Sequence, residues 1–403
     1  MRVLFVPWGM PTHYFHMVPL AWAFRAAGHE VRVTAQPKVA DAVRGSGMVD
    51  VTVAESHDTG AEVAALARRL HTVHRNFDKR EMKAPADLTE EDRAKLRQAR
   101  QATFVGEATA MADDLVREAA SWRPDLVVAD PMALAAPLAA HAAGAPLVHH
   151  LWGPSLLQEI GFPGCGAPTE QWSDELRSLY ERFGVEPRTH HAAGTVDNCP
   201  PGLQVPDVPA PIPVRFVPYN GTGSVPRWLA EQAGRPRVCV TWGTTTTELG
   251  GTERFVVPRI LEGLADHDVE VVLAVSAADR KLLGETGERV RTVEHLPLHL
   301  LLPTCDALIH QGGSGSLLTA TSLGVPQVVV PTMPYLTLNA RQLSRAGAGV
   351  TVDVDGPVAE QIKSAAATVL GDDTVRAAAG RLRAEILDRP APAATVGTLE
   401  QLI

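Results

Sequence analysis

The chain has 403 residues with 45% hydrophobic and 21% charged side chains, a composition typical of soluble globular proteins. Its length exceeds what one compact core usually organises, so we expect two domains. The formal net charge of -9 gives no electrostatic reason to bind nucleic acid or an anionic membrane surface.

The four cysteines, Cys165, Cys199, Cys239 and Cys305, lack the paired spacing of metal ligands, so buried free thiols are expected. An apolar run starts almost at the first residue, and no run reaches the length of a membrane span. We therefore expect no signal peptide, no membrane anchor and a location in the reducing cytoplasm.

The first half alternates short apolar runs with segments of helical spacing. Residues 2–7 are expected to form a strand, 8–13 a loop, 17–27 a helix and 31–35 a strand. Such a βαβ unit builds a parallel sheet whose ligand sites lie at the carboxyl ends of the strands. Further on we expect helices over 88–122, 132–143 and 170–183, and strands over 125–130 and 146–152.

Residues 55–87 are mostly polar and have no strand period. They contain a cluster formed by His71, His74, Arg75, Lys79 and Arg80. Two interpretations stay open: a mobile loop with helices over an acceptor cleft, or a plain solvated surface.

Prolines cluster between residues 198 and 228, where they prevent a helix and favour an extended connector. This segment is the predicted domain boundary. The second half then repeats the alternating plan, with strands expected over 237–242, 270–276, 289–293 and 327–331, and helices over 255–264, 298–302, 358–370 and 374–387. A last helix is expected after Pro390.

A glycine-rich turn stands between an apolar strand at 306–309 and a helical segment at 317–323 that stops at Gly324. The turn reads His310-Gln311-Gly312-Gly313-Ser314-Gly315-Ser316. A strand-to-helix turn aims unpaired helix N–H groups outward, and glycines let a phosphate or diphosphate approach the backbone. The alternative is a tight turn that binds nothing. Neither the Walker pattern nor Gly-x-Gly-x-x-Gly fits these residues.

The order of these motifs is more specific than the turn itself. His310 and the glycines are followed by Gly324-Val325-Pro326-Gln327 and then by Asn339-Ala340. With the runs Cys199-Pro200-Pro201 and Val217-Pro218-Tyr219-Asn220-Gly221, this order resembles the nucleotide-sugar-dependent family 1 glycosyltransferases of the GT-B fold, in particular those that attach deoxysugars to polyketide antibiotics. The resemblance covers essentially the whole chain.

The resemblance implies an α/β fold of two Rossmann-like, doubly wound parallel-sheet domains that face each other across a cleft. We expect an acceptor-binding domain over 1–215, a nucleotide-sugar-binding domain over 216–385, and a final helix over 386–403 that returns to the first domain.

The resemblance also implies the binding residues. The donor diphosphate is assigned to His310, Gly312, Gly313, Ser314, Gly315, Ser316, Thr241, Gly243 and Thr244, with His310 donating to a phosphate oxygen. The nucleoside is assigned to Ser276, His295 and Leu296, and the acceptor to Trp8, Met10 and Trp152.

Transfer needs a base that takes the acceptor proton, and His13 matches the loop histidine that serves as base in similar enzymes. His16 is its rival, one helical turn later, where packing against the helix is the alternative. Asp130 follows a strand and precedes Pro131, so it is expected either to orient His13 or to act as a helix N-cap.

Two positions depart from the family pattern. His295 replaces the usual aromatic residue that stacks on the pyrimidine. Tyr335-Leu336 replaces an acidic residue and a glutamine that grip sugar hydroxyls, so a deoxysugar fits better than a full hexose. Core packing is the alternative for Tyr335.

We therefore expect a metal-independent, inverting transfer from a thymidine-diphosphate (dTDP) sugar, a co-substrate rather than a cofactor, to a polyketide or other natural-product aglycone. O- and C-linkage both stay open, and a homodimer is compatible with the sequence. One rival is a non-catalytic relative that binds nucleotide or aglycone. The other is a nucleotide-sugar epimerase, which the missing carboxylate at Tyr335 disfavours.

Metal chemistry has only weak signals. His149-His150 and His190-His191 have no carboxylate or cysteine at ligand spacing. Asp266-His267-Asp268 resembles the metal motif of GT-A enzymes, but it falls in a surface-like turn rather than at a strand end.

Overall fold

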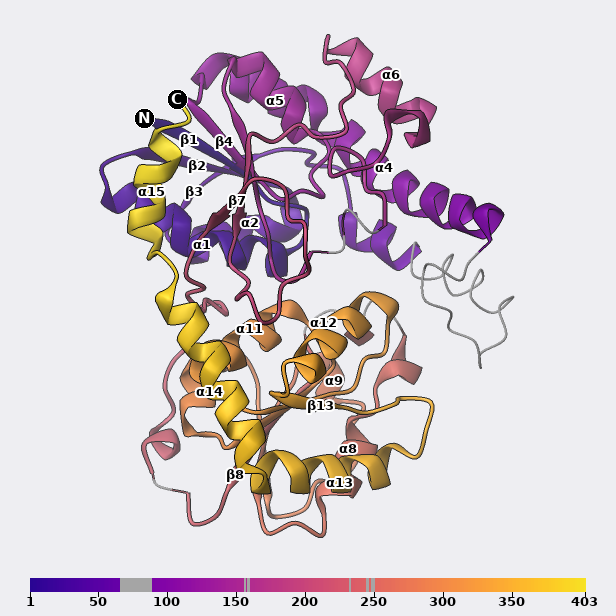
Figure 1. Cartoon of the computed structure of the whole chain (residues 1–403), viewed down its shortest axis with the longest axis vertical. Coiled ribbons are helices and arrows are strands. Elements are labelled where there is room, and N and C mark those ends of the chain that lie inside the picture. Colours follow the sequence, from indigo (N-terminus) through magenta and orange to yellow (C-terminus); the bar gives the residue numbers. More distant parts are fainter. Residues whose placement is uncertain (66–88, 156, 158–159, 232, 244–245, 248–250) are drawn as a thin grey trace.

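The computed structural model in Figure 1 describes residues 1–65, 89–155, 157, 160–231, 233–243, 246–247 and 251–403. Two parallel sheets, one in each half of the chain, confirm the predicted α/β architecture. Thr244 and the cluster from His71 to Arg80 lie outside the described residues.

The first sheet has the order β3-β2-β1-β4-β5-β6-β7, and every pairing is parallel. Its strands are β1 (Arg2–Val6), β2 (Glu30–Ala35), β3 (Val49–Thr52), β4 (Leu126–Ala129), β5 (Leu147–His150), β6 (Gly194–Asp197) and β7 (Pro211–Pro213). The helices of this half are α1 (Pro11–Ala26), α2 (Pro37–Gly45), α4 (Glu90–Trp122), α5 (Ala136–Ala143) and α6 (Asp174–Arg182).

The second sheet has the order β10-β9-β8-β11-β12-β13, the order of a Rossmann sheet, and is also parallel throughout. Its strands are β8 (Arg237–Thr241), β9 (Glu270–Ala274), β10 (Val290–Val293), β11 (Ala307–His310), β12 (Gln327–Val329) and β13 (Gly349–Thr351). Its helices are α8 (Val257–Leu264), α9 (Ala277–Arg280), α10 (Leu298–Leu301), α11 (Ser314–Leu323), α12 (Pro334–Arg345), α13 (Val358–Gly371) and α14 (Asp373–Asp388), and α15 (Pro392–Glu400) ends the chain.

Helices cover both faces of the first sheet. Alternate residues of β1 enter two separate clusters: Leu4 packs with residues of α4 and α5, and Phe5 with residues of α1 and α2. Since both faces are covered, the central strands are apolar at successive positions, which explains the uninterrupted apolar runs in the sequence.

The C-terminal helices cross from the second domain to the first. In Figure 1 the yellow helix α14 runs along the lower domain and α15 lies on the upper one, and both views place the two termini near each other. Helix α14 contacts α11, whereas α15 contacts α1. Val396 and Leu399 belong to the same apolar cluster as Met17 and Phe24, so the last helix completes the core of the first domain.

Several predicted boundaries were wrong. Helix α1 begins at Pro11, inside the segment predicted as a loop, because proline suits the first helical position. Residues 334–345 form helix α12 where the sequence suggested only a loop. The proline-rich connector contains the edge strand β7, and the helix expected over 132–143 begins only at Ala136.

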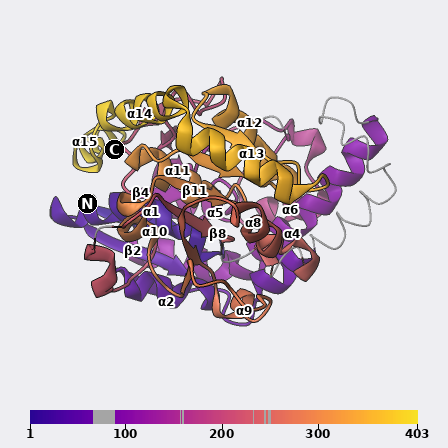
Figure 2. The same cartoon turned by 90° about the horizontal axis from the view of Figure 1, so that it is seen from below.

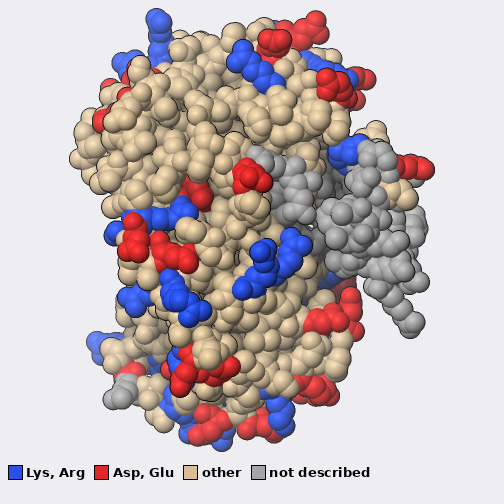
Figure 3. Space-filling model, in the orientation of Figure 1, with Lys and Arg blue, Asp and Glu red and all other residues tan. Residues whose placement is uncertain are grey.

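Charged side chains of both signs are interspersed on the face shown in Figure 3, where neither sign forms a continuous field. Within the described residues, no helix combines the length and the apolar character that a membrane crossing requires.

Candidate active site

The predicted site residues gather where the strand order of each sheet reverses, beside β1 and β4 in the first domain and beside β8 and β11 in the second. The two halves of the site touch. A Cβ placed on Gly153 would lie 2.9 Å from both Cβ and Oγ of Ser314. The first domain therefore closes directly onto the first residue of α11.

His13 and Asp130 form a tight pair. The His13 Nδ1 atom lies 2.7 Å from Asp130 Oδ2, and the other carboxylate oxygen, Oδ1, accepts a hydrogen bond from the Met132 backbone N–H at 2.8 Å. The alternative of a helix N-cap is wrong, because the N-cap of α5 is Ala135; Asp130 instead orients His13 and holds the turn that follows β4. Because the carboxylate accepts from Nδ1–H, the lone pair of the His13 ring stands on Nε2.

Indole rings flank His13 on two sides. The ring centroids of Trp8 and Trp152 both lie 4.7 Å from that of His13. Trp8 also packs on Phe104, with centroids 5.5 Å apart. Trp152 remains partly exposed, whereas Trp8 and Met10 are buried, so of these three predicted acceptor residues Trp152 presents most of its surface to a ligand.

A buried carboxyl group behind the Trp8 loop was not predicted. Glu107 is 2% exposed, and its Oε1 atom accepts from Gly9 N–H at 3.2 Å and from Gln36 Nε2 at 2.6 Å. Its Oε2 atom has no partner among the described residues. Burial raises the pKa of Glu107 to about 8, against the opposing effect of these hydrogen bonds. Its position inside a long helix gave no signal in the sequence.

The glycine turn has the geometry of an anion site. Gly312 has a φ of 101°, a left-handed conformation that favours glycine. Gly313 is the N-cap of α11 and supplies no side chain to the first helical N–H groups. Residues 313–316 are partly exposed, and N–H groups in the first turn of a helix without a side-chain cap are donors that an anion can accept from.

His310 supports the turn from behind. It is fully buried; Nδ1 accepts from Gly312 N–H at 3.1 Å, and Nε2 lies 3.0 Å from Gln327 Oε1. Both ring nitrogens are therefore occupied, and the expected hydrogen bond from His310 to a phosphate is wrong for this arrangement. Burial lowers the pKa of His310 to about 4, so the ring is neutral.

Asn339 on α12 holds the glycine turn through hydrogen bonds. Its Nδ2 donates to Gly312 O at 2.7 Å and to Ser314 Oγ at 3.0 Å. Since the Ser314 oxygen accepts from the amide, its own hydroxyl hydrogen stays available to a ligand.

The end of β8 meets the turn through Gln311. Cβ atoms placed on Gly243 and Gly313 would lie 2.3 Å and 2.9 Å from Gln311 Nε2, so this amide fills the space between the two glycines. Gln311 Oε1 is buried and unpaired among the described residues. Thr241, the last residue of β8, is buried and pairs in register with His310.

The predicted nucleoside residues lie beside the ends of β9 and β10. Ser276 is the N-cap of α9, and its Oγ accepts from Asp279 N–H at 3.0 Å. His295 is exposed in a left-handed conformation with a φ of 54°, and Leu296 beside it is half-buried. His295 is therefore accessible for stacking, and Ser276 retains its hydroxyl hydrogen.

Leu336 does not line an open sugar pocket. Leu336 is 2% exposed, and its Cβ would lie 3.2 Å from a Cβ placed on Gly312. The side chain of Leu336 therefore packs against the glycine turn. The side chain of Tyr335 lies outside the described part of the structure.

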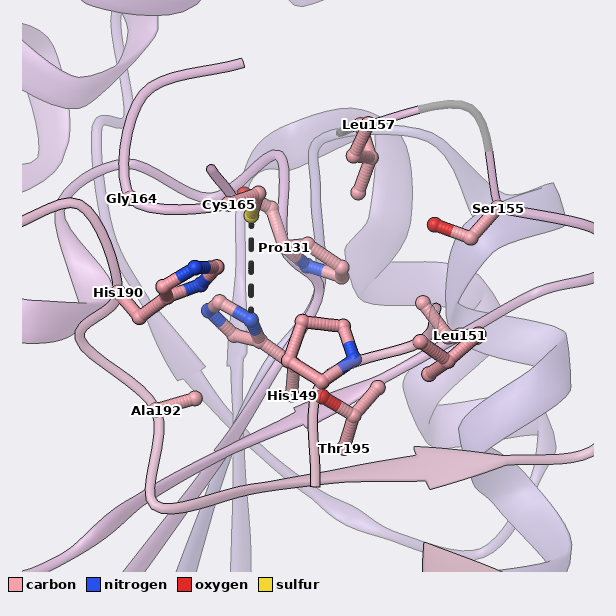
Figure 4. A pocket seen from close by; sticks show the side chains of 12 residues that line it. Pro131, His149, Leu151, Ser155, Leu157, Gly164, Cys165, His190, Ala192 and Thr195 are labelled. Carbon is pink, nitrogen blue, oxygen red and sulfur yellow. Dashed lines mark hydrogen bonds between the residues drawn. The ribbon is translucent and has the colours of Figure 1, made fainter. Parts of the chain in front are cut away.

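His149, Cys165 and His190 line a cavity of about 30 Å³ beside Pro131 (Figure 4). His149 Nδ1 lies 3.9 Å from Cys165 Sγ, and burial lowers the pKa of His149 to about 3. Among the described residues, no three His, Cys, Asp or Glu side chains converge as a metal-binding set.

Comparisons with known proteins cover both halves of the chain. The family model of the N-terminal domain of erythromycin biosynthesis protein CIII-like proteins matches residues 22–243, and that of their C-terminal domain matches 258–402. Tylactone mycaminosyltransferase from Streptomyces fradiae is 36% identical over 429 residues, covering 100% of this chain and 92% of that protein. TDP-daunosamine transferase DnrS from Streptomyces peucetius is 36% identical over 422 residues, covering 100% and 97%.

Solved structures match over the full length as well. Spinosyn rhamnosyltransferase SpnG has a TM-score of 0.81 at 32% identity and covers 100% of both chains. SpnG complexed with thymidine diphosphate has the same TM-score and identity, covering 99% of this chain and 100% of that one.

Proposed function

The chain belongs to the erythromycin biosynthesis protein CIII-like family and is a glycosyltransferase with the two-domain GT-B fold, and from this we propose that it moves a deoxysugar from a dTDP-sugar to a polyketide or other natural-product aglycone. Relatives named as mycaminosyl and daunosamine transferases support the deoxysugar, and the complex of SpnG with thymidine diphosphate supports the nucleotide.

One observation carries the proposal: the His13–Asp130 pair stands beside the glycine turn of the opposite domain. His13 packs on Trp152, the next residue is Gly153, and Gly153 meets Ser314 at the start of α11. A candidate base from one domain and a candidate anion site from the other therefore lie close together. Transfer between two substrates requires such proximity.

The reaction follows from these positions. His13 Nε2 takes the proton of the acceptor as the acceptor atom attacks the anomeric carbon, and Asp130 stabilises the resulting imidazolium through Nδ1–H. The bond between the anomeric carbon and the diphosphate oxygen breaks with its electron pair leaving on the oxygen. The first-turn N–H groups of α11 and the Ser314 hydroxyl receive this charge. Attack opposite the leaving group inverts the anomeric centre.

The surroundings of His13 support an apolar acceptor. Trp8, Phe104 and Phe162 form a buried run of ring contacts behind His13, the last pair with centroids 5.0 Å apart, and Trp152 on the other side of His13 is partly exposed. Aromatic side chains of this kind bind flat or apolar ligands through large contact areas.

A product assay tests the proposal. The purified chain would be incubated with dTDP-deoxysugars and a panel of macrolactone and aromatic polyketide aglycones, and the products weighed by mass spectrometry. We expect an aglycone that gains the mass of one deoxysugar residue together with release of thymidine diphosphate. Tight binding of thymidine diphosphate without transfer to any member of the panel would favour the non-catalytic alternative.

A further inference from the structure

His16 reaches from the acceptor domain to the glycine turn of the donor domain. It lies on α1, one turn after His13, and its Nε2 atom is 3.8 Å from the position that a Cβ on Gly315 would occupy. Gly315 is the second residue of α11. An imidazole nitrogen of the first domain thus stands beside the N–H groups that define the anion site of the second.

The contacts of the ring determine which nitrogen carries the proton. Asn198, which is 2% exposed, directs its Nδ2 atom at His16 Nδ1 from 3.4 Å. With Asn198 Nδ2 as the donor, Nδ1 accepts and the proton of the neutral ring sits on Nε2; Asn198 Oδ1 is buried and has no partner among the described residues. Phe216 packs on the ring with centroids 5.8 Å apart and fixes its position.

The Nε2–H group has no acceptor within the described residues, although it faces a site built for oxygen atoms. The ring stays neutral, since burial, with smaller contributions from His150 and His13, lowers its pKa to about 3. A base of such low pKa is poorly matched to proton abstraction near neutral pH, which argues against the rival role of His16 as the catalytic base. A neutral imidazole still donates a hydrogen bond.

The direction of the bound donor follows from His13. The phosphate that carries the sugar must lie nearest the base, and His13 and His16 share one side of α1 because they are three residues apart. The group that faces His16 is therefore the β-phosphate of the thymidine diphosphate, which gains negative charge when the glycosidic bond breaks.

We propose that His16 is a catalytic residue for the leaving group, which donates a hydrogen bond from Nε2 to a non-bridging oxygen of the β-phosphate across the domain boundary. This inference rests on the proposed function. His13 receives the acceptor proton, His16 keeps its own, and the electron pair of the broken bond stays on the diphosphate. The donor nucleotide thereby holds the two domains together at the place where the acceptor base stands.

Calorimetry with two nucleotides tests the role without turnover. His16→Phe keeps a ring against Phe216 and removes the donor, whereas His16→Gln places an amide N–H near the former Nε2. A hydrogen bond to a charged group is stronger than one between neutral groups. We therefore expect His16→Phe to lower the affinity for thymidine diphosphate about 10- to 100-fold, and His16→Gln to retain most of the wild-type affinity. Thymidine monophosphate, which lacks the β-phosphate, should bind all three proteins alike.

His141→Phe is the matched control, because His141 is an exposed histidine on α5 at the far end of the same domain (Figure 1). A wild-type protein that binds no thymidine diphosphate contradicts the proposed function itself. Two results overturn the role of His16 alone while the wild type binds normally. One is an unchanged affinity of His16→Phe for thymidine diphosphate, and the other is an equal loss of affinity for both nucleotides in this variant. Should His16→Phe fail to fold, His16→Gln and His16→Leu are compared instead, with the same two nucleotides and the same criteria.

Discussion

Asp130 Oδ2 lies 2.7 Å from His13 Nδ1, which joins the end of β4 to the first turn of α1. If His13 is the base, replacing it by alanine should lower turnover about 10²- to 10⁴-fold, the usual range for general base catalysis. Affinity for thymidine diphosphate should stay nearly unchanged, because His13 is not assigned to the nucleotide and, apart from His16, the assigned groups lie in the other domain. Turnover, calorimetry and melting temperature would be measured on the same preparation.

His141→Ala, at an exposed position, controls for loss of a histidine elsewhere in the first domain. Near-normal turnover of His13→Ala would exclude the base role. A steep fall in melting temperature together with the activity would make His13 a packing residue of the Trp8 and Trp152 rings.

The absence of a side chain at Gly153 sets how closely the domains approach. In Gly153→Ala the new Cβ lies 2.9 Å from Ser314 Cβ, an atom fixed by the backbone of α11, so the domains must separate slightly. Misplacement of reacting groups on the scale of 1 Å costs about 10²-fold in rate. We expect turnover to fall about 10- to 100-fold with little change in melting temperature.

Gly284→Ala is the control, because a Cβ at Gly284 meets no atom within 4 Å. Equal and near-normal turnover of both variants would show that the approach of Gly153 to Ser314 does not limit the reaction.

The glycine turn should bind thymidine diphosphate with micromolar affinity, and Gly313→Asp should separate stability from binding. Aspartate is a favourable N-cap residue, and Gly313 has the extended backbone that an N-cap requires. The new carboxylate would accept from the free N–H groups of α11 and repel the diphosphate. The new Cβ would lie 2.9 Å from Gln311 Nε2, the end of a side chain that can shift aside, so we expect a nearly unchanged melting temperature and loss of measurable nucleotide binding by calorimetry.

Gly313→Asn tests the charge, since asparagine caps a helix almost as well without the negative charge. Unaltered nucleotide affinity in the aspartate variant would place the diphosphate elsewhere in the molecule.

Glu107 should make the protein less stable as pH rises. Its pKa is about 8 in the folded chain and near 4.5 when exposed, so between these values the unfolded chain has lost a proton that the folded chain retains. The free energy of unfolding then falls with rising pH, by up to about 1.4 kcal/mol per pH unit for one such group. The dependence should level off above about pH 8, where both states are ionised.

Glu107→Gln keeps a carbonyl acceptor for Gly9 and Gln36 and cannot ionise, so it should melt higher than the wild type at pH 8 and show a flatter pH profile. Glu181→Gln on α6, at an exposed position, is the control. Parallel profiles for wild type and Glu107→Gln between pH 5 and 8 would contradict the raised pKa.

Transfer is expected to proceed without a divalent metal, because the helix N-terminus and hydroxyl donors at Ser314 take up the charge of the leaving group. Turnover would be followed in a chelator and then with added magnesium. Loss of turnover in the chelator followed by its recovery with magnesium would contradict this mechanism.

The sequence predicted the alternating architecture and the glycine turn, because both depend on local patterns. Predictions from the sequence were wrong where contacts between distant parts of the chain determine the position of a side chain. His13 was placed in a loop, since the short apolar spacing of α1 is visible only after Met17. His310 was expected to face a ligand, but the Gln327 amide seventeen residues later in the chain holds its ring inside the domain. Gly153 gave no signal at all, because its importance lies in an atom of the other domain.

The last helix gives the chain an unusual order of folding. Val396 and Leu399 of α15 complete the apolar cluster around α1, the helix that carries His13. The ribosome makes this domain first, whereas α15, which packs on its apolar cluster, follows the second domain in the chain. Until α15 has been synthesised, the part of α1 that packs on Val396 and Leu399 has no cover from this helix. A chain that ends before Pro392 would lose the residues that cover this side of α1, the helix that carries His13.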